Sequence, residues 1–423
     1  MPVPRLLLTI VSIGAILVVC SCSVKEPGGS PDDAYMAQFD PDEYAWQLFF
    51  YLNRPAIAGV AGEADPQRHF GEICGVKDPR RHFGEVCPDT AFVWETWALA
   101  SSDQSEVFTS AGDPPPHDWQ HLVRQSVSRR LKLTPNLESQ MITASLKNEW
   151  RRQFQNDRKS RHRRWRNQQA FETWLRKLFP PEVENNEQEV RINEAAFEGI
   201  LDKKLFSANG LEAQRDFSKG DVSYIQMDRH SKEVKAEWLP LPDEDSKNRY
   251  VWRLGPDGKP YGLVAMHITT KDLPMWFWAT FVHKDCEKAI GACKARSFKA
   301  YENKPVDSTT GLGAKHGSDG VRYETRGTVW ENYILHGTQT NFVRPDGTPT
   351  ELANPVIEAG QAKSRSSCIT CHSYATVGPS EDGDHVKYLD INNLAGAPCA
   401  RWFQEGIKGP CRPVDTSSPA DYI

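Results

Sequence analysis

A Cys-x-x-Cys-His sequence lies near the end of the chain, as Cys368-Ile-Thr-Cys371-His372. Two thiols at this spacing lie one helical turn apart, where they can add to the two vinyl groups of one haem while the adjacent histidine ligates the iron. Only 51 of the 423 residues follow His372, and none of them is methionine. A small cytochrome c places its methionine ligand after the motif, so here we expect the upstream chain to complete the haem pocket.

Two other uses of the motif stay open. A thioredoxin-like redox pair requires a βαβ context, which the pattern around the motif lacks. A zinc site requires a second Cys/His pair at motif spacing, and Cys399 and Cys411 stand too far apart in sequence to provide one. We therefore expect Cys368 and Cys371 to be thioether sites, and His372 to be the proximal ligand of one covalent haem c.

The first 19 residues have the pattern of an export signal. Arg5 precedes a run without charges from Leu6 to Val19, which is 14 residues long. This length suits the apolar region of a signal peptide and is short for a membrane span. Covalent attachment of haem in bacteria takes place outside the cytoplasm, so the export signal and the motif support one another.

The end of this run, Val19-Cys20-Ser21-Cys22-Ser23, resembles a bacterial lipobox, in which the cysteine after a small residue is acylated. Cys22 fits that pattern better than Cys20, because a serine precedes it. We expect a lipoprotein signal peptide over 1–21, lipidation of Cys22, a tether over 22–35, and a periplasmic protein anchored to the outer or cytoplasmic membrane. Ordinary cleavage nearby, which would release a soluble exported protein, is the alternative.

Six further cysteines fall into three local couples. Export permits disulfides, so we expect each couple to close a short loop. Six cysteines allow fifteen pairings, however, and free buried thiols are the alternative. The expected couples are Cys74/Cys87, Cys286/Cys293 and Cys399/Cys411.

The composition suits a folded body with no affinity for nucleic acid. Hydrophobic residues make up 39% of the chain and charged residues 25%, which is typical of a protein with a globular core. The net charge is −5, so no general attraction to nucleic acid is expected. The partner that an exported haem protein suggests is another redox protein.

The sequence pattern changes near residue 220. Helical patterns cover 46–52, 136–179 and 189–205, whereas short aromatic and β-branched runs with turn residues between them follow later. These later runs predict strands at 233–238, 250–254, 261–268 and 276–282.

The predicted fold class is therefore α+β: a helical N-terminal half, a mainly antiparallel sheet in the second half, and a C-terminal haem-binding arm rich in loops. We expect residues 36–423 to form a single haem-binding unit, with a soft boundary near 220 and the haem-attachment segment at 360–423. The 13 tryptophans of the chain suggest that this segment packs on an aromatic-rich scaffold.

Several segments resemble a little-characterised group of bacterial exported proteins, usually called cytochrome c family proteins. The haem segment 366–375 is similar to that group, and so are Trp276-x-Trp-Ala-Thr-Phe-x-His283 and Trp330-x-Asn-Tyr-x-Leu-x-Gly-x-Gln339. Leu52-Asn53 and Val93-Trp-Glu-Thr-Trp97 match more weakly. The resemblance implies one covalent haem c and electron transfer, and it brings no substrate.

We expect a lipid-anchored monohaem c-type cytochrome that carries single electrons, rather than an enzyme. One alternative is a haem c-dependent oxidoreductase, peroxidase-like or an oxidase, with a substrate site in the aromatic-rich upstream body, because that body is larger than electron carriage requires. The other alternative is a non-enzymatic lipoprotein with a structural Cys-x-x-Cys pair. An exchangeable sixth position on the iron would favour the enzyme, and a saturated iron the electron carrier.

The sixth iron ligand is expected among the His and Met side chains of the family-like block 266–283. His283, which closes the aromatic run, is the first choice; Met266 follows, and His267 is the third candidate. Met266 and His267 are adjacent on a predicted strand, so only one of them can face the haem. His336 is also close in sequence to the haem segment. A histidine ligand would give a lower potential than a methionine.

Overall fold

The structure is a computed structural model, and it describes part of the chain. The signal peptide expected at 1–21, Cys22 and the helix predicted at 136–179 lie outside the described residues. The described residues are 26–71, 91–100, 105–109, 112–124, 187–207, 209–210, 226–255, 257–294, 323–344, 347–358, 367–373, 376–377, 386–387 and 418–419.

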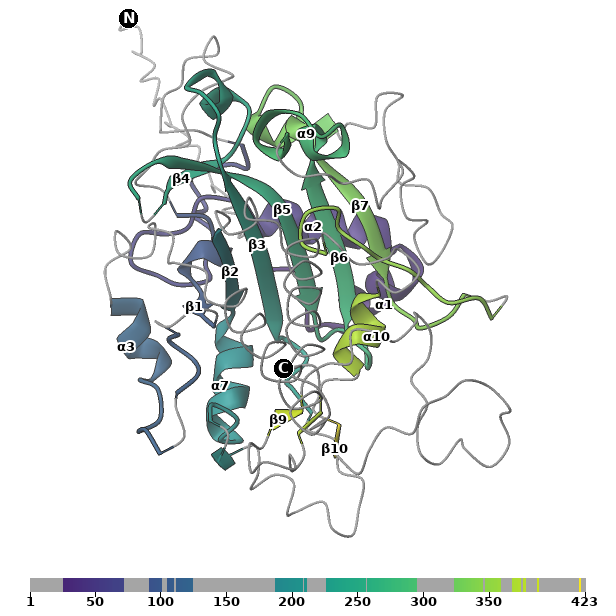
Figure 1. The fold of residues 1–423 in the computed structure, drawn as a ribbon. Coiled ribbons are helices and arrows are strands. Elements are labelled where there is room, and N and C mark those ends of the chain that lie inside the picture. The colour runs from purple at the N-terminus through teal and green to yellow at the C-terminus, as the bar shows by residue number, and fades with distance from the viewer. Residues whose placement is uncertain are drawn as a thin grey trace, which may run out of the picture.

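Among these residues, a seven-stranded antiparallel sheet forms the centre of the molecule (Figure 1). Six strands follow one another in the order β1-β2-β3-β5-β6-β7, and β4 pairs with β5 beside this path. The strands of this sheet are β1 (Ala98–Leu99), β2 (Glu187–Ile192), β3 (Lys232–Pro240), β4 (Trp252–Leu254), β5 (Pro260–Thr270), β6 (Phe277–His283) and β7 (Tyr333–Gln339). A separate small sheet joins β8 (Thr376–Val377), β9 (Val386–Lys387) and β10 (Ser418–Pro419).

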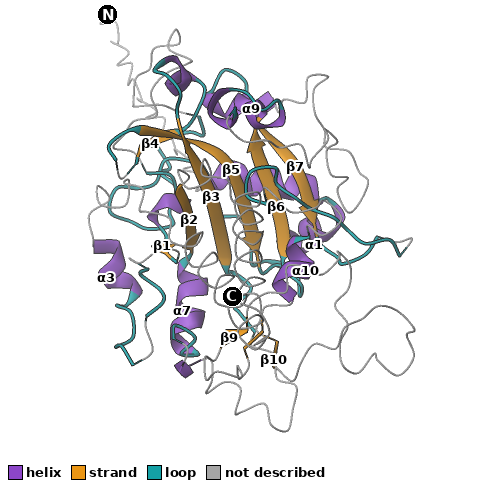
Figure 2. Cartoon of the chain, viewed as in Figure 1, coloured by secondary structure: helices purple, strands orange, loops and turns teal. Residues whose placement is uncertain are grey.

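Helices lie on both sides of the large sheet, as Figure 2 shows by colour. In the view of Figure 1, α2 lies behind the sheet and α10 lies in front of it. None of the helices within the described stretches is both long and apolar enough to cross a membrane. The helices are α1 (Pro31–Phe39), α2 (Pro41–Leu52), α3 (Trp119–Arg124), α7 (Glu194–Asp202), α9 (Lys284–Glu287) and α10 (Cys368–Ser373), with 3-10 turns η1 (Trp94–Thr96), η3 (Asp245–Asn248), η4 (Gly291–Cys293), η5 (Tyr323–Thr325) and η6 (Val329–Asn332).

The rear face of the sheet, which meets α2, carries the main hydrophobic core. Met266 of β5 pairs with Phe281 of β6 across the strands, and both side chains belong to this core. Phe49 of α2 stacks on Phe281 with ring centroids 4.3 Å apart, and Trp46 meets the same ring edge-on at 5.1 Å. Large rings packed in this way bury much apolar area, which is why α2 is fixed to the sheet.

The front face of the sheet is more polar. His267 and Thr280 pair across β5 and β6, one position along from the residues of the rear core, so their side chains point to the front. A smaller core of Ala265 and Val282 lies further along this face, together with Cys286 of α9. The front face is therefore apolar under α9 and polar next to α10.

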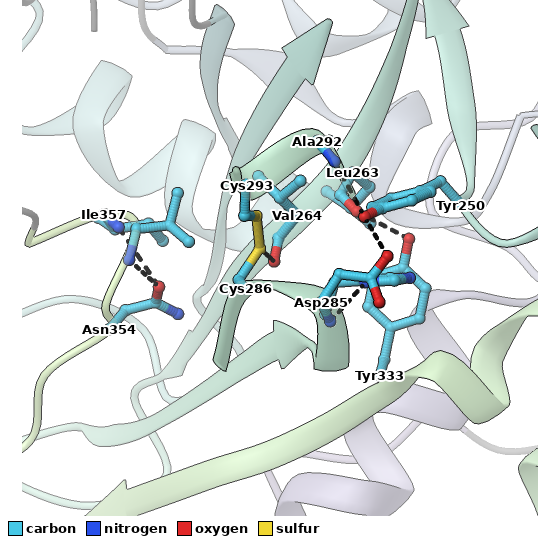
Figure 3. Close-up of a disulfide and its surroundings, with 12 residues drawn as sticks. Tyr250, Leu263, Val264, Asp285, Cys286, Ala292, Cys293, Tyr333, Asn354 and Ile357 are labelled. Carbon is cyan, nitrogen blue, oxygen red and sulfur yellow. Dashed lines mark hydrogen bonds and ion pairs between the residues drawn. A yellow bond between two sulfur atoms is a disulfide. The ribbon is translucent and has the colours of Figure 1, made fainter. Parts of the chain in front are cut away.

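One of the three expected disulfides lies within the described residues. Cys286 of α9 and Cys293 of η4 form it (Figure 3). Beside it, the hydroxyl group of Tyr250 donates to Oδ2 of Asp285 at 2.6 Å, so the same loop is also held by a buried hydrogen bond. The other two couples, Cys74/Cys87 and Cys399/Cys411, lie outside the described residues.

Part of the expected tether is bound to the folded body. Glu26 forms an ion pair with Lys232 at 2.8 Å, and the N–H of Gly29 donates to Oδ1 of Asp272 at 2.6 Å. The hydroxyl group of Ser30 then caps the first turn of α1. The chain is thus attached to the sheet from Glu26 onward.

The predicted α+β class is confirmed, with a difference in the order of elements. β3, β4, β5 and β6 coincide with the predicted strand runs. However, β2 comes before residue 220 and pairs with β3, so the sheet continues across the expected soft boundary. The helix predicted at 189–205 begins only at Glu194, as α7, because the side chain of Asn193 caps it by accepting the N–H of Ala196 at 3.2 Å.

Candidate functional site

The Cys-x-x-Cys-His motif forms helix α10, on the front face of the sheet. Cys368 and Cys371 stand one turn apart in this helix, and His372 follows directly. Cys368 is partly buried and packs against buried hydrophobic residues of the same cluster as Trp278 and Ile369, whereas the side chain of Cys371 is outside the described part of the structure. The backbone therefore presents the motif as a helical turn, which is the form in which both thiols can reach one haem.

Gln339, the last residue of β7, holds the first turn of α10. Its Oε1 accepts the N–H of Ile369 at 3.1 Å, and its Nε2 donates to Oγ of Ser367 at 2.8 Å. Ser367 in turn accepts the N–H of Thr370 at 3.3 Å. These contacts satisfy two of the N–H groups that a helix leaves free at its start. Because Gln339 is fully buried, they also tie α10 to the edge strand of the sheet.

His372 lies against Trp278 of β6. The ring centroids are 4.5 Å apart, and the rings are tilted by 48°. The indole is itself fixed, because its N–H donates to the carbonyl oxygen of Met275 at 3.1 Å. Burial, and then the charge of Lys235, lower the pKa of His372 to about 4. The imidazole is therefore neutral at physiological pH, and the neutral imidazole is the form that ligates a metal.

A second histidine of the front face, His267, lies close to His372. The pairing of β5 with β6 makes His267 a diagonal neighbour of Trp278, the residue against which His372 lies. Burial is the main cause that lowers the pKa of His267 to about 3, and the charges of Lys235 and His372 add to it. His267 is therefore also neutral at physiological pH.

The ring nitrogen Nε2 of His267 has no hydrogen-bond partner among the described residues, although the side chain is buried. Oε2 of Glu358 lies 3.6 Å from it, which is beyond hydrogen-bond length. Burial raises the pKa of Glu358 to about 7, and its Oε2 accepts the N–H of Asn354 at 2.6 Å. A buried imidazole nitrogen without a partner is unfavourable, so this position suits a ligand.

A third buried histidine, His336, stands at a bulge in the pairing of β6 with β7. Thr280 pairs with Gly337, and the next residue of β6 pairs with Leu335. His336 is therefore the extra residue of β7, with no partner across the strands. Its Nδ1 makes no hydrogen bond within the described residues and lies 3.8 Å from Oε1 of Glu287 in α9.

Met266 is separated from the motif by the sheet itself. Its side chain points to the rear face and is 1% exposed. Its sulfur lies 4.0 Å from Nδ2 of Asn53, the residue after α2. Strand alternation thus directs His267 toward α10 and its neighbour Met266 away from it, so the structure does not support Met266 as an iron ligand.

His283, the first choice for the sixth ligand, is engaged elsewhere in the fold. Its Nδ1 accepts the N–H of Asp285 at 3.1 Å, which caps α9, and its Nε2 lies 3.0 Å from the carbonyl oxygen of Arg249. The ring stacks on Tyr250 with centroids 3.8 Å apart. It also ends β6, five residues from Trp278 and therefore about 16 Å along the strand. Both ring nitrogens are occupied, so the structure does not support His283 as an iron ligand.

The sequence alone did not single out Gln339 or Trp278 for a role at the motif. The available signal was that each lies in a segment resembling the cytochrome c family group, at 330–339 and 276–283. The sequence-predicted Cys368 and His372 are brought together by α10, and His267 joins them from β5. Cys22 lies outside the described residues.

No family model matches this chain, and neither a curated protein nor a solved structure does. Over the described stretches, no group of three or more His, Cys, Asp or Glu side chains is arranged to hold a metal ion. The motif residues fit a covalent haem, because the backbone of α10 places two cysteines one turn apart beside His372, on the face of the sheet that also carries His267, whose Nε2 has no hydrogen-bond partner among the described residues.

Proposed function

We propose that this protein is an exported, lipid-anchored monohaem c-type cytochrome that carries single electrons. The observation that carries the proposal is the position of His372. It follows two cysteines on a helix that Gln339 ties to β7, and its neutral ring lies against Trp278. Both the motif chemistry and the aromatic surroundings are those that a covalent haem requires.

Cys368 and Cys371 would hold the haem covalently. Each thiol adds across one vinyl group, so that the sulfur bonds to one carbon and the hydrogen goes to the other, and no oxidant or reductant is consumed. A haem bound in this way supplies a one-electron ferric/ferrous couple. His372 would ligate the iron with its neutral ring, which lies against the indole of Trp278.

The test of haem binding uses the full chain, produced with and without the haem c maturation system. We expect one haem per chain, retained after denaturation and visible in a pyridine haemochrome assay, and lost in the double variant Cys368→Ser/Cys371→Ser. The matched control is Cys286→Ser/Cys293→Ser, which removes two other cysteines and should keep the haem. A colourless wild-type protein made with the maturation system would overturn the proposal.

The electron partners we propose are redox proteins outside the cytoplasm, one that reduces the haem and one that oxidises it. Lipid anchorage rests on the lipobox around Cys22. We expect the wild-type protein in the membrane fraction and Cys22→Ser in the soluble fraction of the cell envelope, with the haem content unchanged. An equal distribution of both proteins would contradict lipidation at Cys22 and leave the haem proposal standing.

A further inference from the structure

We infer that His267 supplies the second axial ligand of the haem iron, opposite His372. The inference rests on the proposed function, since it concerns the same haem. The inference goes beyond the proposed function because it names the residue that occupies the sixth coordination position of the iron. It thereby decides whether that position is open to substrates.

The first argument is position on the sheet. Trp278 contacts His372, and His267 lies diagonally across from Trp278 on the neighbouring strand, on the same front face. A haem held by α10 on this face has His372 on its own helix and His267 on the sheet opposite that helix.

The second argument is that a ring nitrogen of His267 lacks a hydrogen-bond partner among the described residues. Nε2 of His267 is buried and makes no hydrogen bond to any described residue. Coordination to iron would satisfy a buried polar atom for which the described residues provide no hydrogen-bond partner.

The third argument is comparison with His336, the other buried histidine in the described part of the chain with no hydrogen-bond partner for one ring nitrogen. Trp278 pairs with Gln339, whereas His336 stands three residues earlier on β7, about 10 Å along the strand. The carboxylate oxygen 3.8 Å from its Nδ1 belongs to α9, at the other end of the front face from Trp278. His267 is therefore nearer the motif than His336 is.

The consequence is a six-coordinate iron with two histidine ligands. Such a site has no open position for peroxide or dioxygen, so it favours electron carriage over the oxidoreductase alternative. Two histidines also give a lower reduction potential than a histidine with a methionine.

The experiment measures ferric spin state and axial ligands in the haem-loaded full chain, with electron paramagnetic resonance and near-infrared magnetic circular dichroism. We expect a low-spin signal with two histidine ligands in the wild type. His267→Ala should lose the low-spin signal, and added imidazole should restore it. The matched control is His336→Ala, which removes an equally buried histidine of the same face and should keep the wild-type signal.

His267→Met is the second variant, because it retains a ligating side chain of similar size where alanine leaves a cavity. It should remain low-spin, take on a histidine/methionine signature and show a higher reduction potential. A wild-type signature in both His267 variants, a loss of the low-spin signal in His336→Ala, or a high-spin wild type would each overturn the inference. In all of these cases the covalent haem is still present, whereas failure of the proposed function would leave the wild type without it.

Discussion

Replacing Gln339 with leucine should release α10 from the sheet while the remaining body stays folded. Leucine has nearly the volume of glutamine, so the change removes the hydrogen bonds of the side chain and leaves little cavity. Two of these bonds lie at the start of the motif helix α10, where Gln339 accepts the N–H of Ile369 and donates to Oγ of Ser367. A third bond, from Gln339 to Oγ1 of Thr350, lies outside this helix.

The expected change in the free energy of opening of α10 follows from the hydrogen-bonding groups that the substitution leaves unpaired. The N–H of Ile369 is buried, and leaving it without an acceptor costs about 1–3 kcal/mol. The lost donation to Ser367 contributes about 0.5–1.5 kcal/mol, whereas the donation to Thr350 does not break when α10 opens and is not counted. A total of about 1.5–4.5 kcal/mol raises the opening equilibrium of α10 by at least roughly 10-fold.

Hydrogen exchange of the Ile369 and Thr370 amides, in chain made without haem attachment, measures that opening. The matched control is Thr338→Val on the other face of β7, which removes a buried hydrogen bond to Asp42 at 2.7 Å and should leave the α10 amides unchanged. If the α10 amides of Gln339→Leu exchanged within about threefold of the wild-type rate, Gln339 would not be what holds the helix.

Three further predictions concern the body of the protein. Burial raises the pKa of Glu358 from 4.5 to about 7, so the folded state binds a proton that the unfolded chain has released between these values, and stability falls as the pH rises through that window. The buried histidines, whose lowered pKa values make stability rise with pH, are common to the wild type and Glu358→Gln. The urea midpoint of the wild type relative to that of the variant should therefore fall from about pH 4.5 to about pH 7.5, and a constant difference would contradict the assignment. In the native protein Arg253 donates to the buried carboxylate of Glu95 at 2.6 and 2.7 Å. Arg253→Met leaves this carboxylate without its cation and should lower the free energy of unfolding by about 3–5 kcal/mol. A loss under about 1 kcal/mol in urea denaturation would contradict this. The double variant Cys286→Ala/Cys293→Ala should lose about 2–3 kcal/mol and become insensitive to reductant in thermal denaturation, and an unchanged melting temperature would show that the disulfide adds nothing.

The sheet was predictable from sequence where strands are aromatic and bounded by turn residues. β5 and β6 are of this kind, and they coincide with the predicted runs. β2 was not predictable in the same way, because its sequence Glu-Gln-Glu-Val-Arg-Ile has the charge content of a helix. It forms a strand since Glu189 and Arg191 bury their charges as a pair at 2.9 Å and the backbone pairs with β3. That pairing joins residues more than 40 positions apart, which local propensity does not report.

The motif residues of the candidate site were predictable, and the opposite wall of the site was not. Alternation predicted that only one of Met266 and His267 can face the haem. Which of them lies on the side of α10 depends on how that helix packs against the sheet, and the hydrogen bond from Ile369 to Gln339 that contributes to this packing joins residues 30 positions apart. The engagement of His283 could not be predicted for a related reason, because its role as the cap of α9 depends on where β6 ends.

The attachment of Glu26 to Lys232 has a consequence for where electrons could be exchanged. Glu26 is four positions after Cys22, so a lipid on Cys22 would be attached within about 14 Å of the folded surface. The contact of Gly29 with Asp272 lies just beyond the end of β5, and Thr270 at that end pairs with Phe277, the neighbour of Trp278. The end of the sheet to which residues 26–29 attach is thus the end near Trp278 and α10. Under the proposed lipidation of Cys22, a redox partner held at the same membrane would be close to the proposed haem.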